Sequence, residues 1–422
     1  MLRRRTAVPL CSVATASITL LAAALIGGVP AYAAVQTCGT SGTHSICVTV
    51  PDSPLSGLER VIVTNTPNSG QLDVYWKQGG SSTFLIRQFG PSPESGDYSF
   101  TWPTQKYLDG TGTLKVRVPG NSFVSASNVT LQNGNVSDIQ HSPNDWQSFL
   151  PGPWTQAVDP VVPAVGDGPS DEAESNAVAA MITAAAPPLF LFLGDIYDQG
   201  TYTENLNHYG VSALDDPSGA TLWGTTARVT QPTAGNHEWP GHAADWTDYW
   251  HQRPAYTSFE FGGVLFIDLD TSEPAGVGSP QYTFVQGALA SAPPCVVAYG
   301  HIPPLKNTTI NTNLQPLWSL VATNGGDLWV AGHVHTMSEY VPLDASFQPG
   351  GHLVQLIAGS GGHRLGGTQS ASVVAWSKGK TPGALLLTLN GAANGGTATS
   401  ISWTFESTQG TVLRTGSVDC GS

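Results

Sequence analysis

The sequence predicts an α/β domain preceded by an all-β sandwich domain, and three observations support this. Up to about residue 141 the chain consists of short strand-like segments separated by turn residues, without helical periodicity. From residue 142 onward, strand-like and helix-like segments alternate. In this second part, five apolar runs each end at a residue that can bind a metal. Ligands bind beyond the carboxyl ends of strands in such sheets, so we expect a functional site there.

The first 33 residues have the features of a secretory signal peptide. Arg3, Arg4 and Arg5 form a positive start, residues 13–26 are apolar and small, and 31–33 offer an AxA cleavage site. We therefore expect a secreted protein without membrane attachment after cleavage. Only 11% of the residues are charged and the formal net charge is -14, which argues against nucleic-acid binding through a basic patch.

Four cysteines follow the predicted signal peptide. An even number in an oxidising compartment predicts disulfide bonds, and three connectivities are possible. We favour Cys38 with Cys47 and Cys295 with Cys420, because the first two are close enough in sequence to join one hairpin.

Residues 34–141 are expected to form an immunoglobulin-like or fibronectin-like sandwich. Apolar residues alternate in its strand-like segments, so that each strand has one face for a core. The segment 113–118 is predicted to be the final strand of this domain. Trp76 and Trp102 are interpreted as core residues rather than as a polysaccharide-binding surface, because large aromatic residues are usually buried.

Residues 142–422 are expected to form the α/β domain. A helix is predicted to begin at a capping box of Asp171 and Glu174 and to end before Pro187, which links the first two strands of the sheet. Further helices are predicted in 281–292 and 314–326, each before a strand. This alternation predicts a mostly parallel sheet, and the strands after residue 340 are expected to complete a second sheet.

The five apolar runs carry the chemistry of the chain. A short apolar run that ends in a polar residue, with glycine between them, is typical of a buried parallel strand at the point where it leaves the sheet. Oxygen and nitrogen donors of these types suit Zn, Mn or Fe. The candidate ligands and their neighbour are, in chain order, Asp167, Asp195, Asn236 with His237, His301, and His333 with His335.

In this order the motifs GD, GDxY, GNHE, GH and GHxH resemble those of the calcineurin-like metallophosphoesterase superfamily. With the preceding β-sandwich, the chain is most similar to the purple acid phosphatases and their bacterial secreted relatives. The resemblance extends over about residues 159–420. It implies a four-layer α/β/β/α sandwich for the second domain and two divalent or trivalent metal ions, with Fe, Zn and Mn as candidates.

The resemblance also implies a role for each motif residue. Asp195 would bridge the two metals, and Asp167 and His335 would complete one site with it. The other site would be completed by three further residues, namely Asn236, His301 and His333. His237 would face the substrate and stabilise the transferring phosphoryl group or assist the leaving group.

Two positions depart from the family pattern. Pro169 stands where many members of the superfamily have a ligating histidine, and it cannot bind a metal. Purple acid phosphatases use a tyrosine three residues after the bridging aspartate, but here that residue is Asp198 and the tyrosine, Tyr197, comes one residue earlier. The first metal is therefore expected to be completed by Tyr197, by Asp198 or by water alone, and we favour Tyr197.

The leading hypothesis for function is a secreted, metal-dependent phosphoric ester hydrolase. We expect a phosphomonoesterase in which a metal-bound hydroxide attacks the phosphorus of a small phosphoester substrate. One alternative is a phosphodiesterase acting on phospholipid head groups, nucleotides or wall polymers. Two others are a non-catalytic secreted binding protein on the same fold and a cell-wall adhesin that uses the β-sandwich. The natural substrate and the oligomeric state stay open.

Overall fold

The structure is a computed structural model that describes residues 34–67, 70–90, 98–134 and 141–421. The predicted signal peptide, residues 1–33, lies outside the described residues, and the predicted domain boundary at 141/142 stays a prediction. Within the described ranges, no helix combines the length and the apolar character needed to span a membrane.

The N-terminal part is built from two four-stranded antiparallel sheets, β1-β2-β3-β6 and β5-β4-β7-β8. A short 3₁₀ turn, η1 (Thr104–Lys106), follows β6. The strands are β1 (Val35–Ser41), β2 (His44–Val50), β3 (Leu58–Thr66), β4 (Leu72–Gln78), β5 (Ser81–Gln88), β6 (Tyr98–Pro103), β7 (Gly110–Arg117) and β8 (Val124–Leu131). The predicted all-β architecture is confirmed.

The prediction that 113–118 forms the last strand is wrong, because β8 follows it and pairs with β7. Small and polar residues interrupt the apolar alternation of β8, which explains why the sequence pattern did not reveal it.

The two tryptophans of the sandwich lie in its core, as predicted. Trp76 and Trp102 are 2% and 0% exposed, and their ring centroids are 4.9 Å apart. Apolar residues of both sheets surround them, including Val61 and Leu114. The core interpretation is therefore confirmed.

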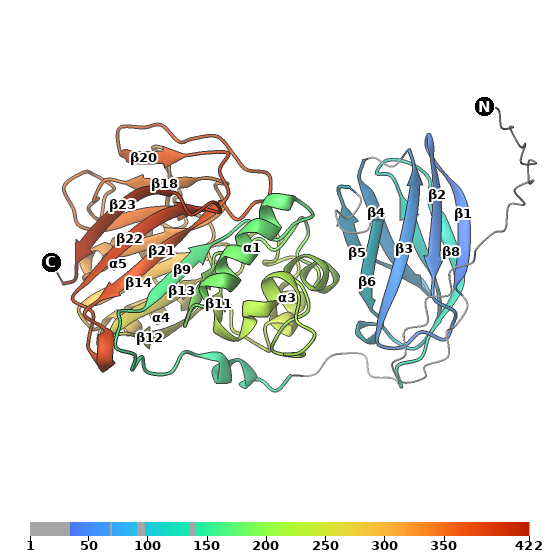
Figure 1. The fold of residues 1–422 in the computed structure, drawn as a ribbon, viewed down its shortest axis with the longest axis horizontal. Helices are drawn as coiled ribbons and strands as arrows, with labels where there is room; N and C mark the ends of the chain where they lie inside the picture. Colours follow the sequence, from blue (N-terminus) through green and yellow to red (C-terminus); the bar gives the residue numbers. More distant parts are fainter. Residues whose placement is uncertain (1–33, 68–69, 91–97, 135–140, 422) are drawn as a thin grey trace, which may run out of the picture. The chain divides into compact units, whose positions relative to one another are not determined.

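The C-terminal part contains two larger sheets, of orders β11-β10-β9-β21-β22-β23 and β12-β13-β14-β17-β19-β18-β20 (Figure 1). The first comprises β9 (Val161–Val165), β10 (Phe190–Phe192), β11 (Thr230–Pro232), β21 (Gly383–Asn390), β22 (Ser400–Ser407) and β23 (Val412–Asp419). The second comprises β12 (Thr257–Phe261), β13 (Val264–Leu269), β14 (Cys295–Gly300), β17 (Leu328–Ala331), β18 (Met337–Tyr340), β19 (Val354–Ala358) and β20 (Val374–Lys378). A small hairpin is formed by β15 (Leu305–Lys306) and β16 (Thr309–Ile310).

Parallel pairing is confined to the strands that carry the motifs and their neighbours. In the first sheet β9, β10 and β11 are parallel, and in the second sheet β13, β14, β17 and β19 are parallel. The expectation of a mostly parallel sheet is thus wrong, since the motif strands are divided between two sheets that also contain antiparallel pairs. The strands after residue 340 were expected to complete a second sheet, but they are divided between the two: β21, β22 and β23 join the first sheet, whereas β19 and β20 join the second. All five residues of β19 are buried, and it pairs parallel with β17 and antiparallel with β18.

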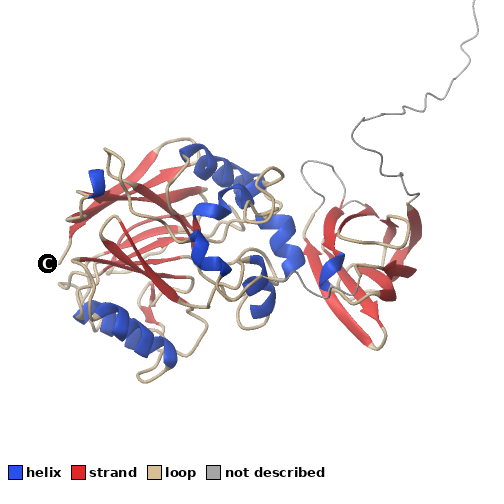
Figure 2. Cartoon of the chain, turned by 90° about the horizontal axis from the view of Figure 1, so that it is seen from below, coloured by secondary structure: helices blue, strands red, loops and turns tan. Residues whose placement is uncertain are grey.

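The two sheets pack face to face, with helices on their outer sides, which gives the four layers α/β/β/α (Figure 2). Strand β14 shows how the sequence produces this arrangement. Val297 and Tyr299 point to the core between the sheets, whereas Val296 and Ala298 point to the core under α4 and α5. Both faces of this strand are buried, so its sequence is apolar throughout.

The helices lie close to where the sequence predicted them. The first predicted helix corresponds to α1, the one in 281–292 to α4, and the one in 314–326 to α5. The α-helices are α1 (Ala173–Ala185), α2 (Tyr202–Glu204), α3 (Ala243–Tyr249), α4 (Pro280–Leu289) and α5 (Gln315–Thr323). The other helical turns are η2 (Asp145–Phe149), η3 (Asn205–Tyr209), η4 (Leu222–Val229) and η5 (Ala393–Gly395).

The capping box predicted for α1 is not formed. Glu172 is the N-cap residue and no side chain caps the helix. Asp171 instead accepts a hydrogen bond from the hydroxyl of Tyr197 at 3.0 Å, so tertiary contacts override the local motif. At the other end, Ala186 adopts the left-handed conformation before Pro187, and the helix ends there as predicted.

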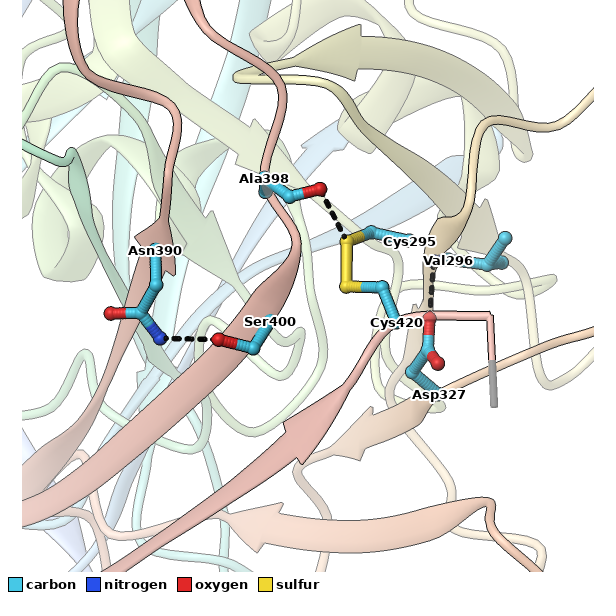
Figure 3. The surroundings of a disulfide bond; sticks show 7 residues. All are labelled: Cys295, Val296, Asp327, Asn390, Ala398, Ser400 and Cys420. Carbon is cyan, nitrogen blue, oxygen red and sulfur yellow. Dashed lines mark hydrogen bonds between the residues drawn. A yellow bond between two sulfur atoms is a disulfide. The ribbon is translucent and has the colours of Figure 1, made fainter.

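Both predicted disulfide bonds are present, Cys38–Cys47 and Cys295–Cys420. The first joins directly opposed residues of β1 and β2. The second joins the start of β14 to the residue that follows β23, and so connects the two large sheets (Figure 3). Beside it, the amide of Val296 donates to the Asp327 carboxylate at 2.7 Å, which ties β14 to the residue before β17.

Candidate metal centre

The predicted ligands all follow the carboxyl ends of strands, as the sequence indicated. They lie on the loops after β9, β10 and β11 of the first sheet and after β14 and β17 of the second. Three of them, Asp195, His301 and His333, have ligand atoms that lie within 4.8 Å of one another. The facing of the two sheets therefore brings residues more than 100 positions apart into one cluster.

Asp195 makes the closest contacts in this cluster. Its Oδ2 atom lies 3.0 Å from Nε2 of His301 and 3.6 Å from Nε2 of His237. Its Oδ1 atom accepts a hydrogen bond from the main-chain amide of His237 at 3.1 Å. Asp195 thus lies between a residue of the second sheet and the GNHE turn of the first, a position that suits a bridging carboxylate.

Asp167 joins the cluster from the loop after β9. Its Oδ1 atom lies 3.2 Å from Nε2 of His335 and its Oδ2 atom accepts the main-chain amide of His333 at 2.7 Å. Nδ1 of His333 in turn lies 3.3 Å from Nε2 of His301. Asn236, on the GNHE turn, is the only exposed member of the predicted set.

The loops that carry the ligands have unusual backbone conformations. Asp167, Asp195 and His333 have φ of 55°, 56° and 64°, in the left-handed region that non-glycine residues rarely adopt. Such residues persist where surrounding structure compensates their cost, which is common at functional sites. A Cβ at Gly235 would meet Oδ1 of Asp195 at 2.0 Å, so the close approach of the two turns requires glycine there.

Three histidines of the centre are oriented by main-chain carbonyls. Nδ1 of His301 lies 2.7 Å from the oxygen of Leu193, and Nδ1 of His335 lies 3.1 Å from that of Arg364. Nδ1 of His237 contacts the carbonyl of Asp198. A carbonyl only accepts, so each Nδ1 carries the proton. In His301 and His335, Nε2 is then the nitrogen that can bind a metal, the arrangement usual for ligating histidines.

The electrostatics of the centre favour positive charge beside its carboxylates. Burial raises the pKa of Asp195, but His301 and His237 outweigh this effect and lower the pKa to about 2. Burial lowers the pKa of His335, but the hydrogen bond to Asp167 raises it to about 9. His333 differs, because burial and the nearby His301 lower its pKa to about 4 and keep it neutral.

Glu238 is a residue of the centre that the ligand pattern did not single out. It is fully buried, and its carboxylate accepts main-chain hydrogen bonds from Asp195 at 3.0 Å, Ile196 at 2.7 Å and Gly235 at 2.8 Å. It therefore holds the turns after β10 and β11 together. The sequence feature that could have identified this residue is the glutamate of the GNHE motif, because a charged residue needs hydrogen-bond partners when it is buried.

The structure gives other partners to the two residues predicted to complete the first metal site. The hydroxyl of Tyr197 donates to Asp171 at 3.0 Å, and its ring stacks on His208 at 3.4 Å. The Asp198 carboxylate accepts hydrogen bonds from Arg87 and Gln199 at 2.8 and 2.9 Å. Whether Tyr197 binds the metal stays a prediction.

A pocket of about 250 Å³ lies beside Tyr197. Its lining includes Phe89, Glu172, His363 and Arg364. Nδ1 of His363 lies 2.8 Å from Glu172, and the guanidinium of Arg364 lies 4.1 Å from the centre of the Phe89 ring. The pocket therefore offers a cation, an aromatic ring and a carboxylate next to the metal centre.

The described residues contain a second cluster of possible metal ligands, His141, Asp215 and His251. Oδ1 of Asp215 lies 2.9 Å from Nε2 of His251 and 3.8 Å from that of His141. However, the two imidazole rings stack at 3.6 Å with an interplanar angle of 22°. Nearly parallel rings cannot both direct Nε2 at one ion in their own planes, so this cluster is a stacked histidine pair rather than a metal site.

The first cluster fits a metal centre better. It combines two carboxylates with three imidazoles, a donor set suited to Zn, Mn or Fe. Buried Oδ1 of Asp167 faces Nε2 of His335 at 3.2 Å, and nitrogens of His301 and His333 face each other at 3.3 Å. Carboxylate oxygens and imidazole nitrogens that face one another in this way are donor atoms that one cation could contact together.

Comparison with known proteins agrees with this chemistry. Residues 135–337 match the family model of the calcineurin-like phosphoesterases. No curated protein matches the chain.

Similar solved structures include a purple acid phosphatase isolated from yellow lupin (Lupinus luteus) seeds, with 13% identity and a TM-score of 0.49, covering 92% of this chain and 74% of that one. A second is PhoD, with 10% identity and a TM-score of 0.41, covering 88% of each chain. A third, from Plasmodium, is described as the anchor in the inner membrane complex, with 15% identity, a TM-score of 0.45, and coverage of 62% of this chain and 89% of that one.

Proposed function

We propose that the chain, whose residues 135–337 match the calcineurin-like phosphoesterases, is a secreted, metal-dependent phosphomonoesterase with a dinuclear centre. The observation that carries this proposal is the convergence of two carboxylates and three imidazoles from the ends of four strands, β9, β10, β14 and β17. The two disulfide bonds are consistent with an extracellular protein.

In this proposal Asp195 is shared by the two ions. Asp167 and His335, which pair at 3.2 Å, complete one site. His301 and His333 belong to the other, together with Asn236 as the family motif implies. Tyr197 is retained as a predicted ligand of the first site. A tyrosinate on ferric iron gives a coloured protein, so the visible spectrum of iron-loaded wild type and Tyr197→Phe tests this point.

When bound, the two ions would neutralise charge on the phosphoryl oxygens and activate the attacking water. His237 is placed to act on the substrate itself. Its side chain is 37% exposed, its Nδ1 is held by the Asp198 carbonyl, and its Nε2 points toward the carboxylate of Asp195 at 3.6 Å. Nε2 can therefore meet a substrate oxygen beside the metals and stabilise the phosphoryl group or protonate the leaving group.

The experiment that tests the proposal compares a phosphomonoester and a phosphodiester that share one leaving group. Rates are measured with the purified protein loaded with Mn, Zn, Fe or Mg. We expect hydrolysis of the monoester to be the faster reaction with at least one metal. Faster hydrolysis of the diester with every metal would establish the phosphodiesterase instead, and no hydrolysis of either would favour the non-catalytic binding protein.

A further inference from the structure

A chain of polar contacts leads from the β-sandwich to the turn that holds His237. It begins at Arg87 in β5, whose Nε donates to Oδ1 of Asp73 at 2.8 Å. Nη1 of the same guanidinium donates to Oδ2 of Asp198 at 2.8 Å. The main-chain carbonyl oxygen of Asp198 accepts a hydrogen bond from Nδ1 of His237. One side chain of the sandwich is thus two contacts away from the residue proposed to act on the substrate.

Hydrogen bonds between main-chain groups and the side chains of Glu204 and Thr201 hold the same strand to the segment after Asp198. The amide of Arg87 donates to Oε1 of Glu204 at 3.0 Å, and Oε2 of Glu204 accepts the amide of Gln199 at 2.8 Å. The hydroxyl of Thr201 donates to the carbonyl of Leu85 at 2.6 Å. This segment is therefore bonded to β5 at several points, and the guanidinium of Arg87 has a defined place.

The two carboxylates that Arg87 contacts are buried. Asp73 is 1% exposed and Asp198 is 9% exposed, and buried polar groups need hydrogen-bond partners. Arg87 contacts both, because its planar guanidinium presents several donors in fixed directions. Of these two carboxylates, Arg117 approaches Asp73 alone, with its Nε atom 3.8 Å from Oδ2. Loss of Arg87 would leave Asp198 buried without its cation, and the turn would have to move to expose the carboxylate.

Movement of the turn that carries Asp198 would also displace the hydrogen-bond partner of His237, the residue proposed to act on the substrate. The Asp198 carbonyl is what keeps the proton of His237 on Nδ1 and turns Nε2 toward Asp195. A displaced carbonyl would free the imidazole to rotate, whereas the metal ligands have their own, separate supports in Leu193, Arg364 and Glu238.

We propose that Arg87 is a positioning residue, which holds Asp198 and thereby the imidazole of His237, so that the β-sandwich takes part in catalysis. This inference rests on the proposed function. It assigns the sandwich a role in the orientation of one active-site group, in place of a purely structural one.

The test uses two phosphomonoesters, an aryl ester with a good leaving group and an alkyl ester with a poor one. If His237 assists the leaving group, its displacement slows the alkyl ester more than the aryl ester. For Arg87→Ala we expect kcat to fall by roughly tenfold or more on the alkyl ester and clearly less on the aryl ester, with a smaller change in KM and unchanged metal content. Arg117→Ala is the matched control, since it removes a guanidinium near Asp73 without touching Asp198.

A double-mutant cycle with His237→Gln separates positioning from general damage. In the His237→Gln background, Arg87→Ala should cause little further loss, because the group that it orients is already absent. Equal losses on the two esters, or full additivity with His237→Gln, would overturn the inference. If Arg87→Ala does not fold, the isosteric Asp198→Asn carries the same test. Inactivity of the wild type on both esters would contradict the proposed function itself, and the inference with it.

Discussion

Glu238 is predicted to be the main support between the two turns that carry Asp195 and Gly235. Its buried carboxylate accepts three main-chain hydrogen bonds. Glu238→Ala leaves three buried donors unpaired, and at about 1 to 2 kcal/mol for each we expect a loss of about 3 to 6 kcal/mol in the free energy of unfolding. Glu238→Gln can keep its side-chain oxygen as the acceptor for the main-chain amides of Asp195 and Gly235, but its NH₂ group would then face the main-chain N–H of Ile196. The free energy of unfolding should therefore fall by about 1 to 3 kcal/mol in this variant.

The measurement is denaturant unfolding at pH 8, with metal affinity determined by competition with a chelator. Burial, and then the charge of Asp195, raise the pKa of the Glu238 carboxyl to about 7, and pH 8 lies above this value. Metal affinity should fall by about 10- to 100-fold in Glu238→Ala. Glu273→Gln is the control, because Glu273 accepts a single bond from Trp239 in the same region. Unfolding within about 0.5 kcal/mol of the wild type, with unchanged metal affinity, would refute the reasoning.

Three further predictions concern packing, cross-linking and pH. Gly235→Ala should abolish metal binding and activity, since its Cβ would come 2.0 Å from Oδ1 of Asp195, whereas Gly241→Ala, with open space around it, should change neither. Replacing Cys295 and Cys420 by alanine should lower the free energy of unfolding by about 2 to 5 kcal/mol in denaturant titrations, and a loss below about 1 would be contrary to this. Burial raises the pKa of Glu204 to about 7, so the folded protein holds a proton there that the unfolded chain has already lost above pH 4.5. As pH rises from 4.5 to 7, the free energy of unfolding of the wild type should therefore fall relative to that of Glu204→Gln, by at most about 1.4 kcal/mol per pH unit. Parallel plots of unfolding free energy against pH for the two proteins would contradict this.

The sequence predicted the features that local patterns encode. Apolar runs that end in ligand residues are visible in one dimension, and the strands before Asp167, Asp195 and His301 lie where these runs indicated. The division of these strands between two sheets was missed, because fully buried strands have the same apolar composition in either sheet. Likewise, Asp171 looked like half of a capping box, but its partner is Tyr197, 26 residues away.

The supports of the centre were harder to predict than its ligands. Arg87 has no motif of its own, and its contact with Asp198 depends on how the sandwich meets the turn after β10. Glu238 is adjacent to His237 in the GNHE motif, yet its role depends on amides from two different loops. Such residues are recognised only when the tertiary structure shows which buried charges share a partner.

The most direct test of a dinuclear centre with Asp195 as the shared ligand is the metal content of the purified protein, measured by elemental analysis with phosphoester hydrolysis. Close to two ions per chain are predicted for the wild type, and Asp195→Asn should lose metal and activity together. Asp216→Asn, at an exposed turn, should retain both. A metal-free wild type after supplementation, or full activity in Asp195→Asn, would contradict the account.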